Sequence, residues 1–169
     1  EKLSGSDIFP KLCEISAEKG YRLFFLGAGE GVAEQAVSNL KKAFSKINVV
    51  GAYAPPLGFE KNEKENEKIC KMINKLAPDI LFVGFGAPKQ EKWIHKNLHA
   101  LNVRVAIAVG AAFDFAAGNI KRAPVFMQKI GLEWFWRFMH EPKRLFKRYF
   151  IDDSQFILIL IKQFWLKIR

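Results

Sequence analysis

The chain has 169 residues, of which 50% are hydrophobic and 26% are charged, and its formal net charge is +10. This apolar fraction predicts a folded domain, because enough surface can be buried to offset the entropy lost on ordering, and it excludes intrinsic disorder. Two cysteines, Cys13 and Cys70, exclude a disulfide-rich scaffold and lack metal-binding spacing. No stretch of the sequence reaches the roughly 20 apolar residues of a membrane-spanning helix.

Helical and strand-like patterns alternate through the first 110 residues. Helices are predicted over residues 6–19, 31–46, 62–76 and 90–98, from capping signals and apolar residues at helical spacing. Strands are predicted over residues 21–26, 48–53, 79–84 and 103–109. These strands are apolar without alternation, so both of their faces are covered. The pattern therefore predicts a Rossmann-like α/β fold, a parallel sheet with helices on both faces.

The sequence changes character after Pro124. The segments 127–138, 143–150 and the closing apolar and basic 155–169 are predicted to form an appendage of two or three helices. Residues 121–169 hold 11 Lys and Arg against 4 Asp and Glu, so they carry +7 of the net charge. Such a basic, aromatic segment is typical of contact with nucleic acid, an anionic membrane or a phosphorylated substrate.

Cations precede the apolar run 156–161 in this segment, which is too short to span a bilayer. We expect it to lie in the membrane interface; the alternative is that its aromatic residues pack on the core. The chain is thus predicted to consist of an α/β core, residues 1–124, and a basic, aromatic, membrane-associating helical appendage, residues 125–169.

Glycine-rich loops follow the first and third predicted strands, where parallel sheets bind ligands. In the first loop, Gly27, Gly29 and Gly31 would let a diphosphate approach the amides at a helix N-terminus. Their spacing is GxGxG, not the dinucleotide fingerprint GxGxxG. A tight turn without a ligand is the alternative.

The loop after the third strand reads GFGAPKQEKW. Gly86 permits a turn, Pro88 begins a helix, and Lys89 and Gln90 lie in its first turn. A polar ligand there would meet backbone amides, a cation and a side-chain amide. Helix capping explains Pro88, but it does not explain a lysine placed against the helix dipole.

Two further loops leave their interpretation open. Asp114 lies between two phenylalanines just past the fourth strand, and it is either a structural carboxylate or a ligand contact. The loop PPLGFE, which contains Phe59, is either a rigid wall or part of a site. The histidines show no metal-ligand spacing, and no DxD pair is present, so no metal site is expected.

Seven segments of the sequence carry a family resemblance: KLSGSDIF, PPLGFE, GAPKQEKWI, VGAAFDFAAG, KRAP, GLEWFWRF and EPKRLFKRY. In this order they resemble the WecG/TagA/CpsF glycosyltransferase family (glycosyltransferase family 26). The resemblance implies an inverting, metal-independent transfer of N-acetylmannosamine or a related hexose from a UDP-sugar, without a cofactor. The acceptor would be a polyprenyl-diphosphate-linked glycan for teichoic acid or exopolysaccharide. The enzyme would be peripheral, at the cytoplasmic face of the bacterial membrane.

The donor pocket of the family lies at the strand ends, which agrees with the loops described above, and together they give candidate roles to individual residues. The donor would be bound by Gly27, Gly29, Gly31, Phe59, Gly86, Lys89, Gln90 and Asp114, with Gln90 also catalytic. The acceptor diphosphate and the membrane would meet Arg122, Arg137, Arg144 and Arg148. Family members carry an acidic residue, proposed as the base, in a segment that precedes KLSGSD. We therefore expect the base upstream of residue 1, or at Asp7.

Two alternatives belong to other functional classes: a non-enzymatic nucleotide- or nucleic-acid-binding domain, and an inactive transferase fragment. Motif residues cluster at strand ends, whereas the core lacks a basic stripe, so the sequence favours the enzyme and no nucleic-acid partner is expected. A homo-oligomer is compatible with the sequence.

Overall fold

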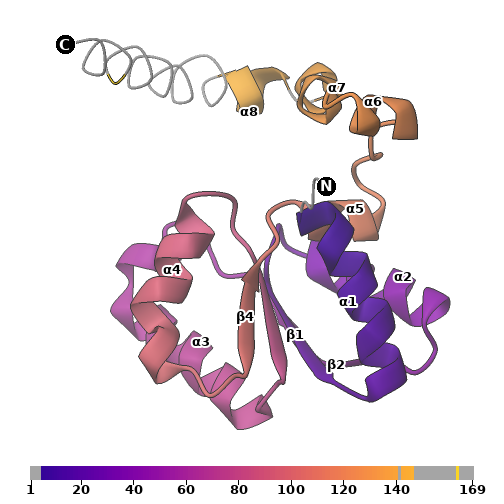
Figure 1. The fold of residues 1–169 in the computed structure, drawn as a ribbon. Helices are drawn as coiled ribbons and strands as arrows, with labels where there is room; N and C mark the ends of the chain where they lie inside the picture. Colours follow the sequence, from indigo (N-terminus) through magenta and orange to yellow (C-terminus); the bar gives the residue numbers. More distant parts are fainter. Residues whose placement is uncertain (1–4, 141, 147–162, 164–169) are drawn as a thin grey trace. The chain divides into compact units, whose positions relative to one another are not determined.

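A computed structural model describes residues 5–140, 142–146 and 163 of the chain. Contacts divide the chain into two units, Glu1–Lys121 and Arg122–Arg169. The elements of the first unit, drawn in Figure 1, are α1 (Gly5–Lys19), β1 (Arg22–Gly27), α2 (Val32–Ala43), β2 (Asn48–Tyr53), η1 (Phe59–Lys61), α3 (Glu63–Leu76), β3 (Ile80–Gly84), α4 (Lys89–Asn97), η2 (Leu98–Ala100), β4 (Val105–Ala108) and α5 (Ala112–Ala117).

Four parallel strands form one sheet in the order β2–β1–β3–β4 (Figure 1). The central strands β1 and β3 pair in register, from Leu23 opposite Ile80 to Gly27 opposite Gly84. Apart from Arg22, every residue of these two strands is buried. The parallel sheet predicted from non-alternating apolar strands is therefore confirmed.

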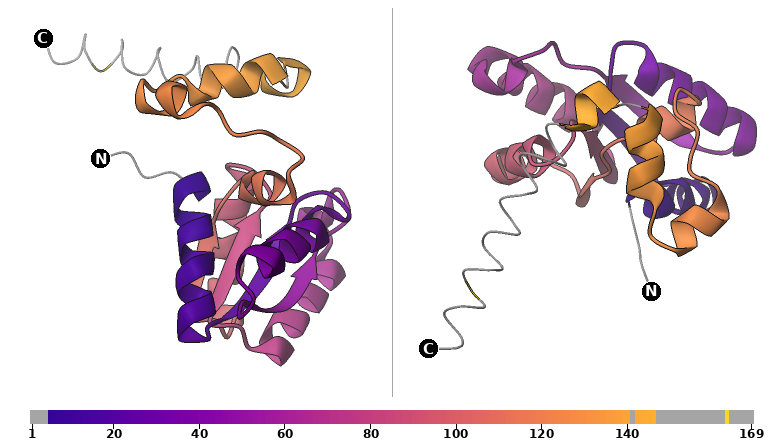
Figure 2. Two further views of the ribbon diagram at one scale, coloured as in Figure 1. Left: turned by 90° about the vertical axis from the view of Figure 1, so that its right-hand side faces the viewer. Right: turned by 90° about the horizontal axis from the view of Figure 1, so that it is seen from above.

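Side chains of β1 alternate between two hydrophobic cores on opposite faces of the sheet. Leu23 and Phe25 belong to the core formed with α1 and α2, and Phe24 and Leu26 belong to the core formed with α3 and α4. Figures 1 and 2 show these two helix layers on either side of the sheet. Helices on both faces, and with them the Rossmann-like α/β fold, are confirmed.

Four phenylalanine rings dominate the core on the α1 side. Phe9, Phe25, Phe82 and Phe113 are fully buried, and their contacting rings have centroids 4.9 to 5.8 Å apart. Each such pair contributes about 0.5–1.5 kcal/mol beyond the burial of area. Because Phe113 belongs to α5, this cluster holds the segment that follows β4 against the sheet.

Most predicted boundaries lie within two residues of the observed ones. One exception is the helix predicted over 31–46, which ends at Ala43 because Phe44 leaves the helical conformation at φ −130°. Another helix boundary has a visible cause: the Asn62 side chain accepts a hydrogen bond from Glu65 N at 3.2 Å and caps α3.

The second unit contains α6 (Val125–Lys129), α7 (Glu133–His140) and α8 (Pro142–Phe146). Gly131 adopts a left-handed conformation (φ 79°) between α6 and α7, so two helices share the segment 127–138. The three described helices agree with the two or three helices predicted after Pro124. The predicted helix over 143–150 is described only to Phe146, and the segment 155–169 lies outside the described residues except for residue 163. None of the described helices is long and apolar enough to cross a membrane.

Candidate functional site

The carboxyl ends of the central strands meet at a topological switch point. The chain leaves β1 through α2 toward β2 on one side, and it leaves β3 through α4 toward β4 on the other. α2 and α4 consequently cover opposite faces of the sheet. Parallel α/β sheets bind ligands in the crevice between such diverging connections. The two glycine-rich loops singled out from the sequence begin side by side at this point, because Gly27 pairs with Gly84.

Gly27 is required by the close approach of the two backbones. Its φ is +117°, and a Cβ atom there would lie 2.6 Å from the carbonyl oxygen of Gly84. The next residue, Ala28, also has a positive φ of 64° and donates its N–H to the same oxygen at 2.9 Å. The turn is thus held tightly against β3. Gly31 ends it at φ 76°, whereas Gly29 has an ordinary φ and is not constrained in this way.

Backbone amides at the start of α2 and α4 lack side-chain caps. The N-cap residues are Gly31 and Pro88, and neither makes a side-chain capping hydrogen bond. By contrast, α3 is capped by Asn62. The first amides of a helix have no partner within the helix, and the dipole there favours anions. Val32 N of α2 and Gln90 N of α4 donate to the carbonyl oxygens of Gly29 and Gly86, each at 3.1 Å. The neighbouring amides of these first turns could meet a phosphate group.

Gln90 is buried and connects two loops of the site. Its Oε1 accepts hydrogen bonds from Gly86 N at 3.2 Å and from Gly110 N at 3.1 Å, and its Nε2 donates to Glu91 Oε1 at 2.9 Å. The loop after β3 is thereby joined to the loop after β4. In this arrangement Gln90 acts as a positioning residue, and its contact with a donor or a reacting group stays a prediction.

Asp7 and Asp114 are half-buried and lie in the first turns of α1 and α5. Both helices meet the carboxyl end of β4. A Cβ atom on Gly5, in the first turn of α1, would lie 3.2 Å from the carbonyl oxygen of Val109, and α5 follows directly from that strand. The fold therefore brings both carboxylates, far apart in the sequence, to the same edge of the sheet.

Phe59 and Lys89 lie at the α4 side of the site. Phe59 is buried, and its ring centroid is 4.7 Å from that of Phe85 in the core. Lys89 Nζ lies 3.4 Å from Glu60 Oε1 and 6.0 Å from the centroid of the Phe59 ring. The first-turn lysine that helix capping could not explain is thus partnered by a carboxylate from η1. Donor contacts by Phe59 and Lys89 stay predictions.

The predicted acceptor-binding arginines all belong to the second unit. Arg122 Nε lies 3.4 Å from Glu133 Oε1, a partly buried pair that joins the start of this unit to α7. Arg137 and Arg144 lie in α7 and α8, and Arg148 lies outside the described residues. Among the described residues, no group of three His, Cys, Asp or Glu side chains could hold a metal ion.

Two asparagines that the sequence did not single out organise the site. Asn39 on α2 donates to Ala116 O and Ala117 O, at 2.9 and 3.1 Å, and so ties α2 to α5. Asn66 on α3 accepts from Trp93 Nε1 at 2.7 Å. Only their polar character on otherwise apolar helix faces signals these roles in the sequence.

Comparison with known proteins identifies the family. The profile described as "Glycosyl transferase WecG/TagA/CpsF family" matches residues 1–169. The chain belongs to this family. Three relatives bear the name N-acetylglucosaminyldiphosphoundecaprenol N-acetyl-beta-D-mannosaminyltransferase. The relative from Bacillus spizizenii is 35% identical over 85% of this chain and 53% of its own length. The one from Bacillus subtilis is 33% identical over 96% of this chain and 60% of its own length. The one from Staphylococcus aureus is 31% identical over 85% of this chain and 54% of its own length. The chain thus spans a little over half the length of these relatives.

Proposed function

We propose that this family member is a UDP-sugar-dependent glycosyltransferase acting in bacterial cell-surface polysaccharide synthesis. It would transfer N-acetylmannosamine or a related hexose to a polyprenyl-diphosphate-linked N-acetylglucosamine. The relatives' shared name supports both the sugar and the acceptor. The observation that carries the proposal is the pair of uncapped helix N-termini, those of α2 and α4, at the switch point of the sheet.

The donor diphosphate would lie against the first amides of α2 and α4. An acceptor hydroxyl oxygen would attack the anomeric carbon from the face opposite the diphosphate, so that the bond to UDP breaks and the configuration inverts. A carboxylate would take the hydroxyl proton as the general base. Backbone amides would stabilise the charge that develops on the departing diphosphate, a role that requires no divalent metal. Asp7 is the candidate base within this chain, and a residue upstream of it is the other.

Binding of UDP tests the donor site directly. Calorimetric titration of the protein with UDP, in the presence and absence of EDTA, should give the same affinity. A strict requirement for a divalent metal would contradict the metal-independent mechanism. No binding of UDP under either condition would contradict the donor site itself.

Turnover tests the base. With UDP-N-acetylmannosamine and a short-chain prenyl-diphosphate-linked N-acetylglucosamine, residues 1–169 should transfer sugar slowly if the base lies upstream, since general base catalysis contributes roughly 10²–10⁴-fold. Rapid transfer would instead place the base within the chain. In that case Asp7→Asn should lower the rate by a factor in the same range.

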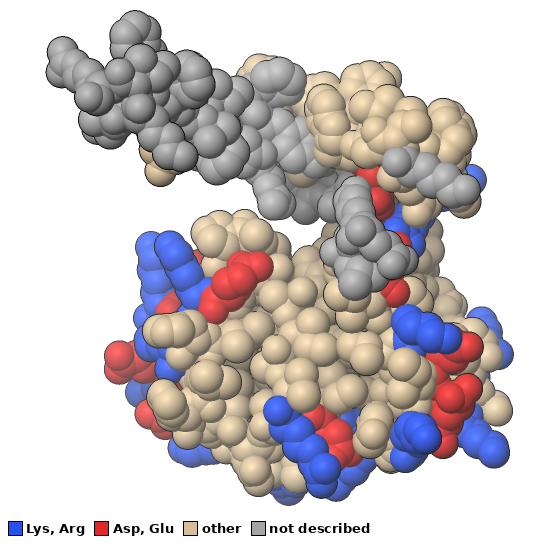
Figure 3. All heavy atoms as spheres, in the orientation of Figure 1, with Lys and Arg blue, Asp and Glu red and all other residues tan. Residues whose placement is uncertain are grey.

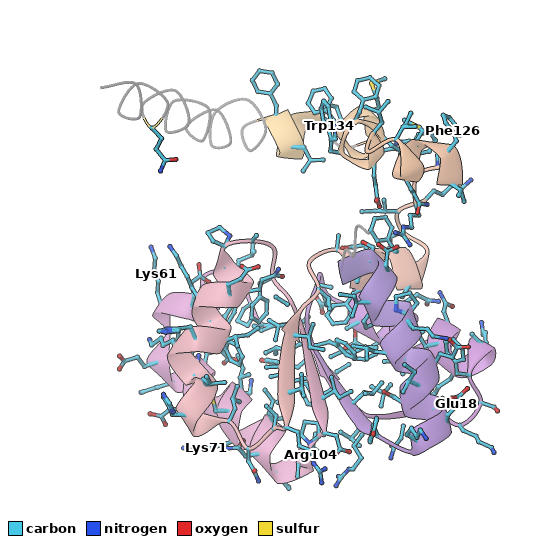
Figure 4. The ribbon with its side chains drawn as sticks, in the orientation of Figure 1. Glu18, Lys61, Lys71, Arg104, Phe126 and Trp134 are labelled. Carbon is cyan, nitrogen blue, oxygen red and sulfur yellow. The ribbon has the colours of Figure 1, made fainter. Side chains whose placement is uncertain are left out.

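We also propose that the second unit associates with the cytoplasmic face of the membrane. Large apolar side chains are exposed on α6 and α7, among them Phe126 and Trp134 (Figure 4), together with Met139. Exposed aromatic groups beside cations are typical of interfacial helices. Charge reversal at Arg144 and Arg148 should weaken co-sedimentation with anionic vesicles in a salt-dependent way, and removal of 151–169 should abolish it. Equal pelleting of intact and truncated protein would contradict the predicted role of the tail.

A further inference from the structure

The outer edge of β4 is open. In the part of the chain that the structure describes, β4 has β3 as its one neighbouring strand, and the two pair in regular register. Val105 N and Val109 N donate toward β3, at 3.2 and 2.9 Å. Because successive peptide groups of a strand point to opposite sides, the N–H and C=O groups of Ala106 and Ala108 point away from β3. The edge therefore offers backbone donors and acceptors to another strand.

The residues of β4 do not block such pairing. Natural edge strands usually prevent it with charged residues, proline or a β-bulge. The sequence of β4 is VAIA, without charge or proline. At the other edge, β2 is interrupted by a bulge at Val50, since its pairing steps from Val49 to Gly51 while β1 advances by one residue. Figure 3 views the unit from the β4 side, and uncharged side chains fill the surface between the charged groups over α4 and those over α1.

Helix α1 begins beside the carboxyl end of β4, where a Cβ atom on Gly5 would lie 3.2 Å from Val109 O. The helix then leads into β1. On the way its Phe9 ring packs against those of Phe25 on β1 and Phe82 on β3, with centroids 5.4 and 4.9 Å apart. Figures 1 and 2 show α1 nearer to β4 than α2 is. Polypeptide that enters α1 therefore arrives at the edge where β4 ends.

The handedness of the connections fixes where a strand before α1 would lie. Connections between parallel strands are right-handed in about 98% of cases. The connection from β1 to β2 runs toward the β2 edge with α2 on one face, whereas the two that run toward the β4 edge have α3 and α4 on the other face. Because α1 shares the face of α2, a right-handed connection through α1 into β1 must start on the β4 side of β1. There β3 and β4 already occupy the sheet, so the next position is the outer edge of β4.

Apolar side chains near this edge are incompletely covered. Val105 is 46% exposed, and it lies on the α1 face of the sheet, as Ile107 of the same strand does. On α1, Ile8 and Ile15 lie seven residues apart, are half-buried and belong to neither hydrophobic core. With Phe9 turned toward the sheet, the right-handed turn of α1 puts both isoleucines on its flank toward the β4 edge. A strand beside β4 would cover these groups.

We propose that the outer edge of β4 pairs with a parallel strand of the polypeptide that precedes α1. This strand runs in the direction of β4, ends beside Val109 and enters α1, so that strand, α1 and β1 form a right-handed β–α–β unit. The partner is thus an extended, largely apolar segment, which α1 covers on one face. The chain spans a little over half the length of its curated relatives, and the rest of such a polypeptide is long enough to include this strand.

The added strand would extend the candidate site. Residues between its carboxyl end and Gly5 pass the edge of the sheet where Asp7 and Asp114 lie. A general base upstream of this chain, which is the alternative to Asp7 in the proposed mechanism, would reach the site by this route. That step alone rests on the proposed function, whereas the pairing of β4 does not.

Amide hydrogen exchange, measured by nuclear magnetic resonance, tests the pairing. In residues 1–169, the amides of Ala106 and Ala108 should exchange at least about tenfold faster than that of Ile107, which faces β3. In a chimera, the residues that precede the matching region of the Bacillus subtilis relative are joined to residue 1. Exchange at Ala106 and Ala108 should then slow by about tenfold or more, because the tether makes even a weak strand contact intramolecular. Unchanged exchange at both amides would overturn the proposal.

A pair of proline substitutions in the chimera supplies the matched control. Ala106→Pro removes one outward N–H and leaves the hydrogen bonds to β3 in place, since proline is tolerated on edge strands. It should abolish the protection of Ala108. Val50→Pro, at the bulge on the other edge, should leave that protection unchanged. Equal effects of the two substitutions would show that the protection does not come from pairing at β4, and the proposal would fail.

The direction of pairing distinguishes the proposed strand from a second copy of this chain. Two copies related by a two-fold axis would pair their β4 edges antiparallel, with short Hα–Hα contacts across the edge. Nuclear Overhauser spectra of the chimera should lack such contacts. A dimer of residues 1–169 that shows them and that Ala106→Pro dissociates, with the chimera still dimeric, would assign the edge to a second copy and overturn the proposal. No measurement here uses a nucleotide or a sugar, so these results stand whether or not the proposed function fails.

Discussion

Truncation of Gln90 should loosen two loops of the site at once. In Gln90→Ala, the amides of Gly86 and Gly110 lose the oxygen that accepts both of their hydrogen bonds. A net contribution of about 1 kcal/mol per hydrogen bond gives a loss of about 2 kcal/mol in the free energy of unfolding. With a denaturant slope of about 2 kcal/mol/M, the urea midpoint should fall by roughly 1 M.

Gln35→Ala is the matched control for this truncation. Gln35 is exposed on α2, and its side chain donates to Asn39 Oδ1 at 3.1 Å. Its removal should change the free energy of unfolding by less than about 0.5 kcal/mol. Urea unfolding of both variants, followed by circular dichroism, measures the difference. A midpoint for Gln90→Ala no lower than that of Gln35→Ala would refute the positioning role.

A second variant separates positioning from contact with the donor. In Gln90→Glu, a carboxylate oxygen can still accept the two amide hydrogen bonds, but the other oxygen replaces Nε2, which lies 2.9 Å from Glu91 Oε1, so only part of the stability lost in Gln90→Ala should return. The amide donor Nε2 is lost, however. If Gln90 contacts the donor diphosphate, Gln90→Glu should bind UDP at least about tenfold more weakly, because a negative charge replaces a donor beside an anion. Unchanged UDP affinity would restrict Gln90 to positioning.

Three other predictions concern stability and reactivity. Gly27→Ala should lower the free energy of unfolding by about 3 kcal/mol or more, because residue 27 has a φ of +117° and the new Cβ atom would lie 2.6 Å from a carbonyl oxygen. Gly20→Ala, with open space around it, should lower that free energy by about 1 kcal/mol. Thermal unfolding compares the two variants. Asn66→Ala should cost about 3 kcal/mol, since the buried Trp93 indole loses its acceptor, and a smaller shift than that of Gly20→Ala would argue against it. Burial raises the pKa of the Cys13 thiol to about 12, so the thiol should resist alkylation at pH 8 until the protein is unfolded. The free energy of unfolding should decrease as the pH rises from about 9 toward 12, because only the unfolded thiol ionises in that range. Rapid labelling of the folded protein would contradict the burial.

The sequence alone determined the alternating helices and strands up to residue 109 and their order, because hydrophobic periodicity and capping are local properties. It did not predict α5, which lies in a segment expected to be a loop. The strand predicted over 48–53 has the observed bounds of β2, and Pro88 marks the start of α4 as expected. Strands without alternation predicted a sheet covered on both faces, and the two cores confirm it. The loops after β1 and β3 were recognised as candidate sites because small residues there permit close approach of a ligand.

Only the tertiary structure decided what those loops and their neighbours contact. The strand order placed Gly27 against Gly84, so the need for glycine at position 27 comes from the close contact between β1 and β3. Folding also turned Gln90 toward Gly110, 20 residues away, and Asn66 toward Trp93, 27 residues away. Each of these contacts depends on which strands are neighbours and on their register. Local periodicity carries no information about partners so distant in the chain, because they meet only when the sheet has formed.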